Sequence, residues 1–265
     1  MQRIGFIGIG LMGHGMAKNL VKKGHPLTFL VHRNRSNVSD LLDAGAKEAS
    51  SARELMSGCD VAILCVTGTP QVEANVYGSD GLFAAAKRGQ IVIDCATSRP
   101  ESPDRIRADF EPKGVNFVDA PLARTPLHAE EGKLNCMVGA DATTLAAVRP
   151  VLEKFCENIF HVGGPGVGHR IKLVSAGGAN SNMFQMVVPK ALEGDLTGLQ
   201  FTLGNAAKDI GYYQQMLAGA PMAGAMGAAL QQVLVQANAL GLGEKFVPSL
   251  IEAYGKVNGI QVVKH

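Results

Sequence analysis

The residues of this chain with the clearest chemical meaning form a glycine-rich loop near its start. Gly8, Gly10 and Gly13 make the pattern G-x-G-x-x-G, with Leu11 and Met12 between the last two glycines. An apolar run precedes this loop, and a segment with helical spacing follows it. In a strand–loop–helix unit such glycines permit a tight turn and let the pyrophosphate of a dinucleotide approach the helix N-terminus. The loop therefore predicts a dinucleotide cofactor.

The end of the next predicted strand indicates which dinucleotide binds. An NAD site carries Asp or Glu about 20 residues beyond the glycines, where the carboxylate binds the ribose 2′-hydroxyl. Here the segment contains no carboxylate and consists of His32, Arg33, Asn34, Arg35 and Ser36. A planar guanidinium can pair with two phosphate oxygens at once. We predict NADPH (NADP+ when oxidised), bound first by Arg33 and second by Arg35; the alternative is that both arginines are solvated surface residues.

These loops require a sheet that positions them, and the apolar pattern predicts one. Short β-branched runs alternate with helical patterns as far as His161, as in a parallel sheet with crossover helices. After the run from Gly163 to Gly166, segments rich in Ala, Met, Leu and Gly at helical spacing follow. The sequence thus predicts an α/β N-terminal domain over residues 1–162, a Rossmann-type doubly wound parallel sheet, and an all-α domain for substrate binding and dimerisation over residues 163–265.

The individual elements follow from the same pattern. The predicted strands are 3–8, 27–31, 61–66, 90–94, 116–119, 135–139 and 158–161. The predicted helices are 12–23, 38–44, 71–76, 81–86, 103–110, 142–154, 200–217, 222–240 and 247–256. Small residues and methionines in the last helices suit a subunit interface as well as a core, so we expect a homodimer or homotetramer.

Composition excludes several classes of partner. The 265 residues include 25 Lys and Arg against 23 Asp and Glu, so the net charge of +2 creates no field that attracts nucleic acid or an anionic membrane. No apolar run approaches the ~18 residues of a membrane span, and we expect a cytoplasmic protein. The five cysteines form no CxxC pair, and no cluster has metal-ligand spacing, so buried reduced thiols and no metal are expected.

Several spaced motifs together resemble the β-hydroxyacid dehydrogenase family. That family includes 3-hydroxyisobutyrate dehydrogenase, tartronate semialdehyde reductase and sulfolactaldehyde reductase. The resemblance implies that the sheet domain binds a nicotinamide cofactor and that substrate lies between the two domains. The motifs are Gly8-x-Gly10-x-x-Gly13-x-x-Met16-Ala17-x-Asn19-Leu20, Asp94-Cys95-Ala96-Thr97-x-x-Pro100, Asp119-Ala120-Pro121, Gly166-x-Gly168-x-x-x-Lys172 and Lys208-Asp209.

The resemblance also implies roles for single residues. Lys172 matches the family's catalytic lysine, which donates a proton to the carbonyl oxygen and stabilises the developing alkoxide. Thr97 falls near the nicotinamide ring, and Lys208 reaches cofactor and substrate unless Lys208-Asp209 is only a surface pair. Cys65 and Val66 lie at the end of the predicted strand 61–66, at the edge where ligands bind in open α/β sheets.

One loop departs from the family and carries information on the substrate. The family continues Asp-x-Pro-Val-Ser-Gly-Gly, whereas this chain has Ala123, Arg124 and Thr125 in place of Ser-Gly-Gly. The sulfolactaldehyde reductase branch resembles this chain in having Arg-Thr at that place. A guanidinium and a hydroxyl there predict an anion with three oxygens, a sulfonate or phosphonate. The alternative is that Arg124 points outward and a carboxylate binds.

A stretch of the family pattern is absent beside the proposed lysine. Family members continue Lys-x-x-Asn-Asn into a long connecting helix, but here Val174 is followed by Ser175 and a small-residue segment typical of a later loop. The shortfall is about 30 residues, including a 20-residue helix of about 30 Å. We interpret it as a segment left out of the printed sequence rather than a deletion, and do not assign the role of the family's Asn to Ser175. An intact mass about 3 kDa above 27.8 kDa would confirm this.

The sequence thus favours an NADPH-dependent reductase of a small aldehyde or ketone bearing a sulfonate or phosphonate, with Lys172 as proton donor. One alternative is a carboxylate-specific 3-hydroxyacid dehydrogenase of the 3-hydroxyisobutyrate or tartronate semialdehyde type. An alternative of another class is a non-catalytic dinucleotide-binding interaction module. An intact Lys172 counts against the latter, because a protein that only binds need not keep a proton donor.

Overall fold

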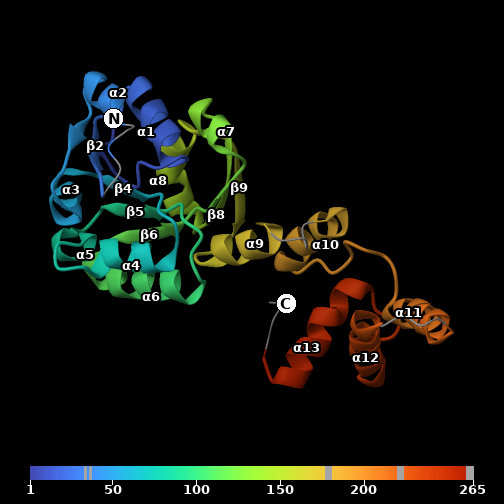
Figure 1. Cartoon of the computed structure of the whole chain (residues 1–265). Coiled ribbons are helices and arrows are strands. Elements are labelled where there is room, and N and C mark those ends of the chain that lie inside the picture. Colours follow the sequence, from blue (N-terminus) through green and yellow to red (C-terminus); the bar gives the residue numbers. More distant parts are fainter. Residues whose placement is uncertain (33–34, 36–37, 177–180, 220–223, 261–265) are drawn as a thin grey trace. The chain divides into compact units, whose positions relative to one another are not determined.

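The computed structural model comprises two compact units, Met1–Gly177 and Gly178–His265 (Figure 1). The structure describes residues 1–32, 35, 38–176, 181–219 and 224–260; the side chains of 172–176 and 192 lie outside this description. Arg33 and Asn34 therefore fall outside the described residues. Each unit is considered by itself.

One sheet organises the first unit. In the part of the chain that the structure describes, nine strands follow the order β3-β2-β1-β4-β5-β6-β8-β7, with β9 beside β8. The first six strands in this order are parallel, β8 is antiparallel to β6 and β7, and β9 is parallel to β8. The predicted doubly wound sheet is confirmed. The strands are β1 (Ile4–Ile7), β2 (Leu27–Leu30), β3 (Lys47–Glu48), β4 (Val61–Leu64), β5 (Ile91–Asp94), β6 (Asn116–Asp119), β7 (Leu122–Ala123), β8 (Leu134–Gly139) and β9 (Cys156–Gly163).

Strand order reverses between β1 and β4, where the chain passes from one half of the sheet to the other. In open α/β sheets, ligands bind outside the carboxyl ends of the strands at such a switch point. The glycine-rich loop leaves β1 at this place. The helices of the unit are α1 (Gly13–Lys22), α2 (Ser39–Asp43), α3 (Ala52–Gly58), α4 (Thr69–Tyr77), α5 (Leu82–Ala85), α6 (Glu101–Phe110), the 3-10 turn η1 (Glu111–Lys113), α7 (Pro126–Glu130), α8 (Ala142–Leu152) and α9 (Val167–Ala176).

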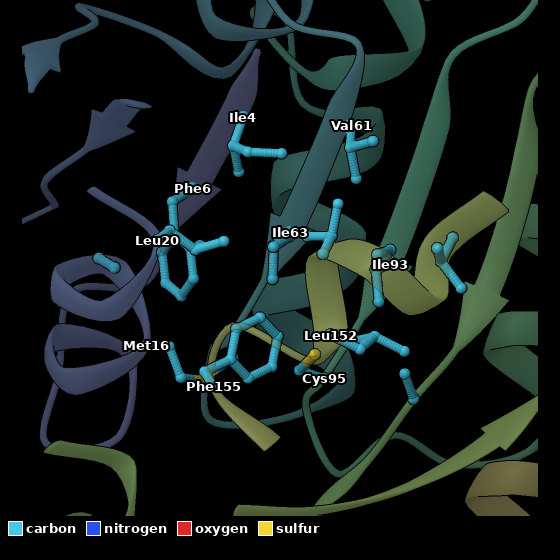
Figure 2. Close-up of a cluster of buried hydrophobic side chains, with 14 of the residues drawn as sticks. Ile4, Phe6, Met16, Leu20, Val61, Ile63, Ile93, Cys95, Leu152 and Phe155 are labelled. Atoms are coloured by element: carbon cyan, nitrogen blue, oxygen red, sulfur yellow. The ribbon is translucent and has the colours of Figure 1, made fainter. Parts of the chain in front are cut away.

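Two apolar cores bury both faces of the central strands. On one face, Ile4 and Phe6 of β1 and Ile63 of β4 pack with Met16 and Leu20 of α1 (Figure 2). On the other, alternate residues such as Ile7, Leu64 and Val92 pack with α3 to α6. Burial on both faces explains why these strands are continuous apolar runs rather than alternating ones.

Two elements between 46 and 60 were not predicted. The strand β3 consists of the polar pair Lys47–Glu48 at the sheet edge, so it carries no apolar pattern. The helix α3 begins at a cap in which Ser51 Oγ accepts from the Glu54 N–H, and Glu54 accepts from the Ser50 N–H. A serine followed three residues later by a glutamate is a capping signal, and it could have predicted α3.

The described residues of the second unit form helices and one isolated bridge between Thr202 and Phe246. They are α10 (Asn182–Leu192), α11 (Leu203–Ala218), α12 (Ala225–Ala239), η2 (Val247–Ser249) and α13 (Leu250–Asn258). The predicted helical C-terminal region is confirmed. The predicted boundary at 162–163 precedes α9, whereas the first compact unit extends to Gly177 and includes this helix, because α9 packs on β8 and β9.

Candidate functional site

The three glycines of the loop after β1 meet different surroundings. Gly8 has φ +106°, and a Cβ there would lie 2.2 Å from the carbonyl oxygen of Cys65. A Cβ at Gly13 would lie 1.9 Å from the carbonyl oxygen of Gly8, so this glycine lets α1 start directly against the loop. At Gly10, by contrast, no heavy atom of the described residues lies within 4 Å of such a Cβ.

The open space at Gly10 lies at the start of α1. Among the described residues, no side chain caps this helix, and its first turn contains no acidic residue. Uncapped N–H groups and the positive end of the helix dipole favour an anion there. The loop therefore fits the pyrophosphate of a dinucleotide. Leu11 is exposed and Met12 is half-buried beside this space.

The loops that follow β4 and β5 begin at the same edge of the sheet as the glycine loop. The Cys65 N–H donates to Ile7 O at 2.8 Å, which holds the chain after β4 beside Gly8. Cys65 and Val66 are half-buried there, and Thr97, after β5, is exposed. A Cβ at Gly68 would be 3.5 Å from the carbonyl oxygen of Thr97, so the two loops are neighbours. The structure thus places Cys65 and Val66 beside Gly8, and Thr97 beside Gly68 in the loop after β4.

The segment after β2 is only partly described. His32 is exposed, and Arg35 forms a two-pronged ion pair with Glu48 of β3, at 2.6 and 2.7 Å. The hydrogen bond from Arg35 lowers the pKa of Glu48. This carboxylate was not predicted, because Glu48 lies beyond the end of β2 in the chain and β3 brings it beside Phe29 only through the sheet register.

The loop that departs from the family pattern lies at the end of β7. Ala123 is its last residue, and Arg124 has φ +83°, a left-handed conformation that favours glycine. The Arg124 guanidinium donates from Nη1 to Lys133 O at 2.7 Å and to Glu157 Oε2 at 2.5 Å. The exposed Thr125 shares a 2.8 Å hydrogen bond between its Oγ1 and His128 Nδ1. Arg124 is therefore held by Glu157 of β9.

Two buried aspartates hold the start of the lysine-bearing helix α9. Asp119 Oδ1 accepts from the Gly166 N–H at 2.7 Å, and Oδ2 accepts from the His169 N–H at 3.2 Å. Burial raises the pKa of Asp119, although these hydrogen bonds and the charge of His169 oppose the rise. A Cβ at Gly168 would lie 2.6 Å from Asp119 Oδ2, so this position requires glycine.

The side chain of His169 makes the second attachment. Its Nε2 lies 3.1 Å from Asp94 Oδ2, and this carboxylate also accepts from Ser98 Oγ and the Ala96 N–H. Lys172 follows His169 by three residues on α9, and its side chain lies outside the described atoms. Asp94 and Asp119 were identified only as motif residues without a role, because their partners Gly166 and His169 are 47 to 75 residues away in the chain.

The motif residue Asn19 attaches α7 to α1. Its amide donates to Gly15 O, Ala129 O and Glu130 O at 2.8 to 3.1 Å. A Cβ at Gly15 would lie 2.4 Å from Glu130 N, so the two helices touch closely there. Since α7 directly follows Thr125, Asn19 links the glycine loop's helix to the loop of Arg124.

Lys208 lies in the second unit, on α11. Its Nζ is 3.3 Å from Asp209 Oδ1 and 5.9 Å from the centre of the Tyr212 ring. Lys208 therefore belongs to a different unit from the residues at the strand ends, which are Gly8, Cys65, Val66 and Thr97.

The cysteines are free thiols, four of them buried and Cys65 half-buried. Burial raises the pKa of Cys59 to about 11 and that of Cys65 to about 12, so both thiols stay protonated at neutral pH. Within the described residues, no group of His, Cys, Asp and Glu could hold a metal ion. None of the described helices is long and apolar enough to span a membrane.

Comparison with known proteins places this geometry in a family. Residues 3–163 match the family model described as the NAD binding domain of 6-phosphogluconate dehydrogenase. The chain belongs to this family. The matched range covers the sheet, the glycine loop and the strand ends described above, so these parts constitute an NAD-binding domain. The predicted resemblance to β-hydroxyacid dehydrogenases is confirmed, since the relatives include proteins of that group.

Two similar proteins differ in their named activities. The chain is 39% identical over 173 residues to the NAD-dependent L-serine dehydrogenase of Pseudomonas aeruginosa, a match that covers 65% of this chain and 58% of that protein. It is 28% identical over 286 aligned positions to the 3-sulfolactaldehyde reductase of Escherichia coli, covering 95% of each chain. The second alignment has more positions than this chain has residues, so that relative carries residues without a counterpart here.

A solved structure shares the fold over nearly the whole chain. The 3-hydroxyisobutyrate dehydrogenase of Mycobacterium tuberculosis, in a structure with L-serine, superposes with a TM-score of 0.60 at 22% identity. The match covers 96% of this chain and 99% of that one. At this identity the likeness concerns the fold alone, a sheet domain followed by helices.

Proposed function

We propose that the protein is an NADPH-dependent reductase of a small aldehyde or ketone that carries a sulfonate or phosphonate group. The observation that carries the proposal is the open space at Gly10, here called the cradle, which lies in the same unit as the helix of Lys172. That helix is anchored by Asp119. A site that only bound a dinucleotide would not need two buried aspartates to fix a lysine-bearing helix. This favours the enzyme over the non-catalytic interaction module.

Different residues of this chain have different roles in the proposed reaction. Main-chain N–H groups at Gly10 and the start of α1 bind the pyrophosphate, and Thr97, Cys65 and Val66 border the place for the nicotinamide. The bound cofactor supplies a hydride to the carbonyl carbon. Lys172 donates a proton to the carbonyl oxygen and stabilises its negative charge as it develops. Lys208 is a second candidate for contact with substrate and cofactor.

The substrate anion is assigned to Arg124 and Thr125. Support comes from the backbone of Arg124. Its φ of +83° is a conformation that favours glycine, yet this chain has an arginine, with its guanidinium, at this position. Glu157 neutralises part of this charge, so an incoming anion must compete with a carboxylate at 2.5 Å. A phosphonate dianion gains more from this arginine than a monoanion does.

A panel of matched carbonyl compounds tests the proposal. NADPH oxidation is measured with carboxylate, sulfonate and phosphonate versions of one short aldehyde. We expect the best kcat/KM for a sulfonate or phosphonate and a loss of about 10- to 100-fold in Arg124→Ala, the value of a charge-assisted hydrogen bond. Glu157→Gln, the matched control, should lower KM for the same compound because it removes the competing carboxylate. An unchanged kcat/KM in Arg124→Ala contradicts the assignment.

A carboxylate-specific 3-hydroxyacid dehydrogenase is the second candidate. It is favoured by the Arg124–Glu157 pair, which occupies the guanidinium, and by the L-serine dehydrogenase among the relatives. The same panel separates the candidates, since this enzyme turns over the carboxylate fastest and is indifferent to Arg124→Ala. Absence of turnover with every aldehyde and ketone supports the binding module instead.

The choice of NADPH depends on the arginines after β2. Glu48 binds Arg35 through both of its oxygens and also repels a 2′-phosphate. Glu48→Gln should therefore strengthen NADPH binding by about threefold or more, as expected for an exposed pair, and leave NADH binding unchanged. Arg35→Ala should weaken only NADPH binding. Fluorescence titration with both cofactors measures this, and a wild-type preference for NADH contradicts the assignment.

A further inference from the structure

We propose that His169 is a positioning residue that joins the helix of the proton donor to the loop beside the nicotinamide site. The inference rests on the proposed reduction, in which Lys172 donates the proton. His169 does not touch substrate in this proposal. It acts through Asp94 on the relative placement of two loops that must meet the same carbonyl group.

The contact between His169 and Asp94 is completely enclosed. His169 is 1% exposed and Asp94 is 0% exposed, with 3.1 Å between Nε2 and Oδ2. A buried carboxylate requires partners, because losing one leaves an uncompensated charge in a medium of low polarity. Here the partners are His169, Ser98 Oγ at 2.8 Å and the Ala96 N–H at 2.9 Å. Asp94 thus ties α9 to residues 94–98, the loop that carries Thr97.

The side chain of His169 contributes something that the backbone cannot. The bonds from the Gly166 and His169 N–H groups to Asp119 are main-chain bonds, so they form with almost any residue at 169. They fix where α9 begins on β6. Among the described side chains of α9, the imidazole is the one that bonds to β5, and Arg170 adds an ion pair to Asp104 of α6. The buried imidazole therefore connects α9 directly to residues 94–98, the loop of Thr97.

Lys172 is one helical turn beyond His169, about 4.5 Å along the axis at 1.5 Å per residue. A shift of α9 is therefore passed directly to the lysine backbone. Misplacement of a catalytic group by 1 Å can cost about 100-fold in rate. Loss of the His169–Asp94 bond should consequently reduce the rate of reaction more than the affinity for NADPH.

The structure also suggests which residue can replace the histidine. Only Nε2 is bonded, while Nδ1 is buried without a hydrogen-bond partner among the described residues. A glutamine places an amide N–H at about the distance of Nε2 along the side chain, so His169→Gln can keep the bond to Asp94. His169→Leu fills a similar volume and cannot donate.

The test compares these two variants in the full-length protein. We expect His169→Leu to lower kcat by about 10- to 100-fold with KM for NADPH within twofold of wild type, and His169→Gln to stay within about threefold in both. Phe110→Leu, in the core on the other face of the sheet, is the control for general destabilisation and should leave kcat unchanged. Equal losses in His169→Gln and His169→Leu, or an unchanged kcat in His169→Leu, overturn the proposal.

A second measurement separates this inference from the proposed function. If the wild type turns over no carbonyl compound, the proposed function fails and the kinetic comparison is replaced by hydrogen–deuterium exchange of residues 167–176. Exchange there should be faster in His169→Leu than in wild type and Phe110→Leu, and normal in His169→Gln. Equal exchange in the two His169 variants overturns the positioning role without reference to turnover.

Discussion

Gly8, Gly10 and Gly13 differ in what a methyl group would meet, although the sequence pattern treats them alike. At Gly8 and Gly13 the obstacle is the protein's own backbone, 2.2 and 1.9 Å away. At Gly10 a methyl group would meet no heavy atom of the described residues, so it would obstruct only a ligand that occupies this space. Single substitutions can therefore separate folding from cofactor binding within one loop.

We predict that Gly10→Ala leaves stability unchanged or raises it by about 0.4–1 kcal/mol, because alanine restricts the unfolded chain. The same change should weaken NADPH binding by about tenfold or more, since the methyl group fills the cradle. Gly13→Ala is the matched control, which should destabilise the fold by about 1–3 kcal/mol through overpacking. Thermal unfolding and NADPH titration measure both. Tight NADPH binding by Gly10→Ala would show that the pyrophosphate lies elsewhere.

Among the elements, α1, α2 and α7 meet at one histidine. His14 Nδ1 is 2.5 Å from Glu130 Oε1 on α7, and Nε2 is 3.1 Å from both oxygens of Asp40 on α2. Lys18 also binds Glu130, at 3.1 Å. Burial favours a lower pKa for His14, but hydrogen bonds and charges from Glu130 and Asp40 outweigh it and raise the pKa above 6.5. His14 therefore joins α1, which follows the glycine loop, to α2 and to α7, which follows the loop of Arg124.

This junction should depend on pH in a defined direction. Because the pKa of His14 is raised in the folded state, its contribution is complete below pH 6.5 and is lost as pH rises through the folded value. The pKa values of Asp40 and Glu130 are lowered, in spite of burial, by their bonds to His14, so their contributions are lost only as pH falls below 3.8 and 4.5. The junction is strongest between these limits.

We predict that His14→Gln destabilises the protein by about 1 kcal/mol at pH 6, the scale of a partly exposed ion pair, and by less at pH 9. Urea unfolding of wild type and variant across this range gives the difference. Lys18→Met is the control, because it removes the other ion pair of Glu130 and leaves the histidine in place, so its effect should differ less between pH 6 and pH 9. A His14→Gln effect that is equally constant contradicts the pH-dependent junction.

The elements differ in how far the sequence could predict them. β1, β4 and β5 are apolar runs because both of their faces are buried, and the glycine loop is contiguous, so both were predictable. The pair Lys47–Glu48 has no such pattern, and its role became visible only when the sheet placed Glu48 beside Arg35. The attachments of α9 to Asp94 and Asp119 join distant segments, which no local pattern reports.

At the scale of the whole molecule, the described residues of the second unit include more large exposed apolar side chains than buried ones. Its buried cluster is limited to Leu203, Leu234, Ala237, Leu242 and Ala253. Large apolar side chains remain exposed on α10 to α13, and Met226 at 89%, Met216 at 65% and Tyr212 at 60% are the most exposed on α11 and α12. Apolar surface of this kind marks interaction sites.

We predict that this surface associates copies of the chain into a homo-oligomer. Sedimentation of wild type at micromolar concentration should show a dimer or tetramer, and Met216→Lys combined with Met226→Lys should shift it toward monomer because burying charges at an interface is costly. Leu42→Lys, at an exposed apolar position of the first unit, is the control and should leave the assembly intact. A monomeric wild type contradicts the prediction.

The attachment of α9 to β5 and β6 has a consequence for how such a protein can diversify. Lys172, Arg124 and the glycine loop all belong to the first 177 residues, and the lysine helix is attached to the sheet. Insertions, losses or exchanges downstream of α9 would then leave the attachment of this helix to the sheet unchanged. In the proposed reaction, the position of the Lys172 backbone is thus set by the sheet, and the remainder of the chain is free to vary.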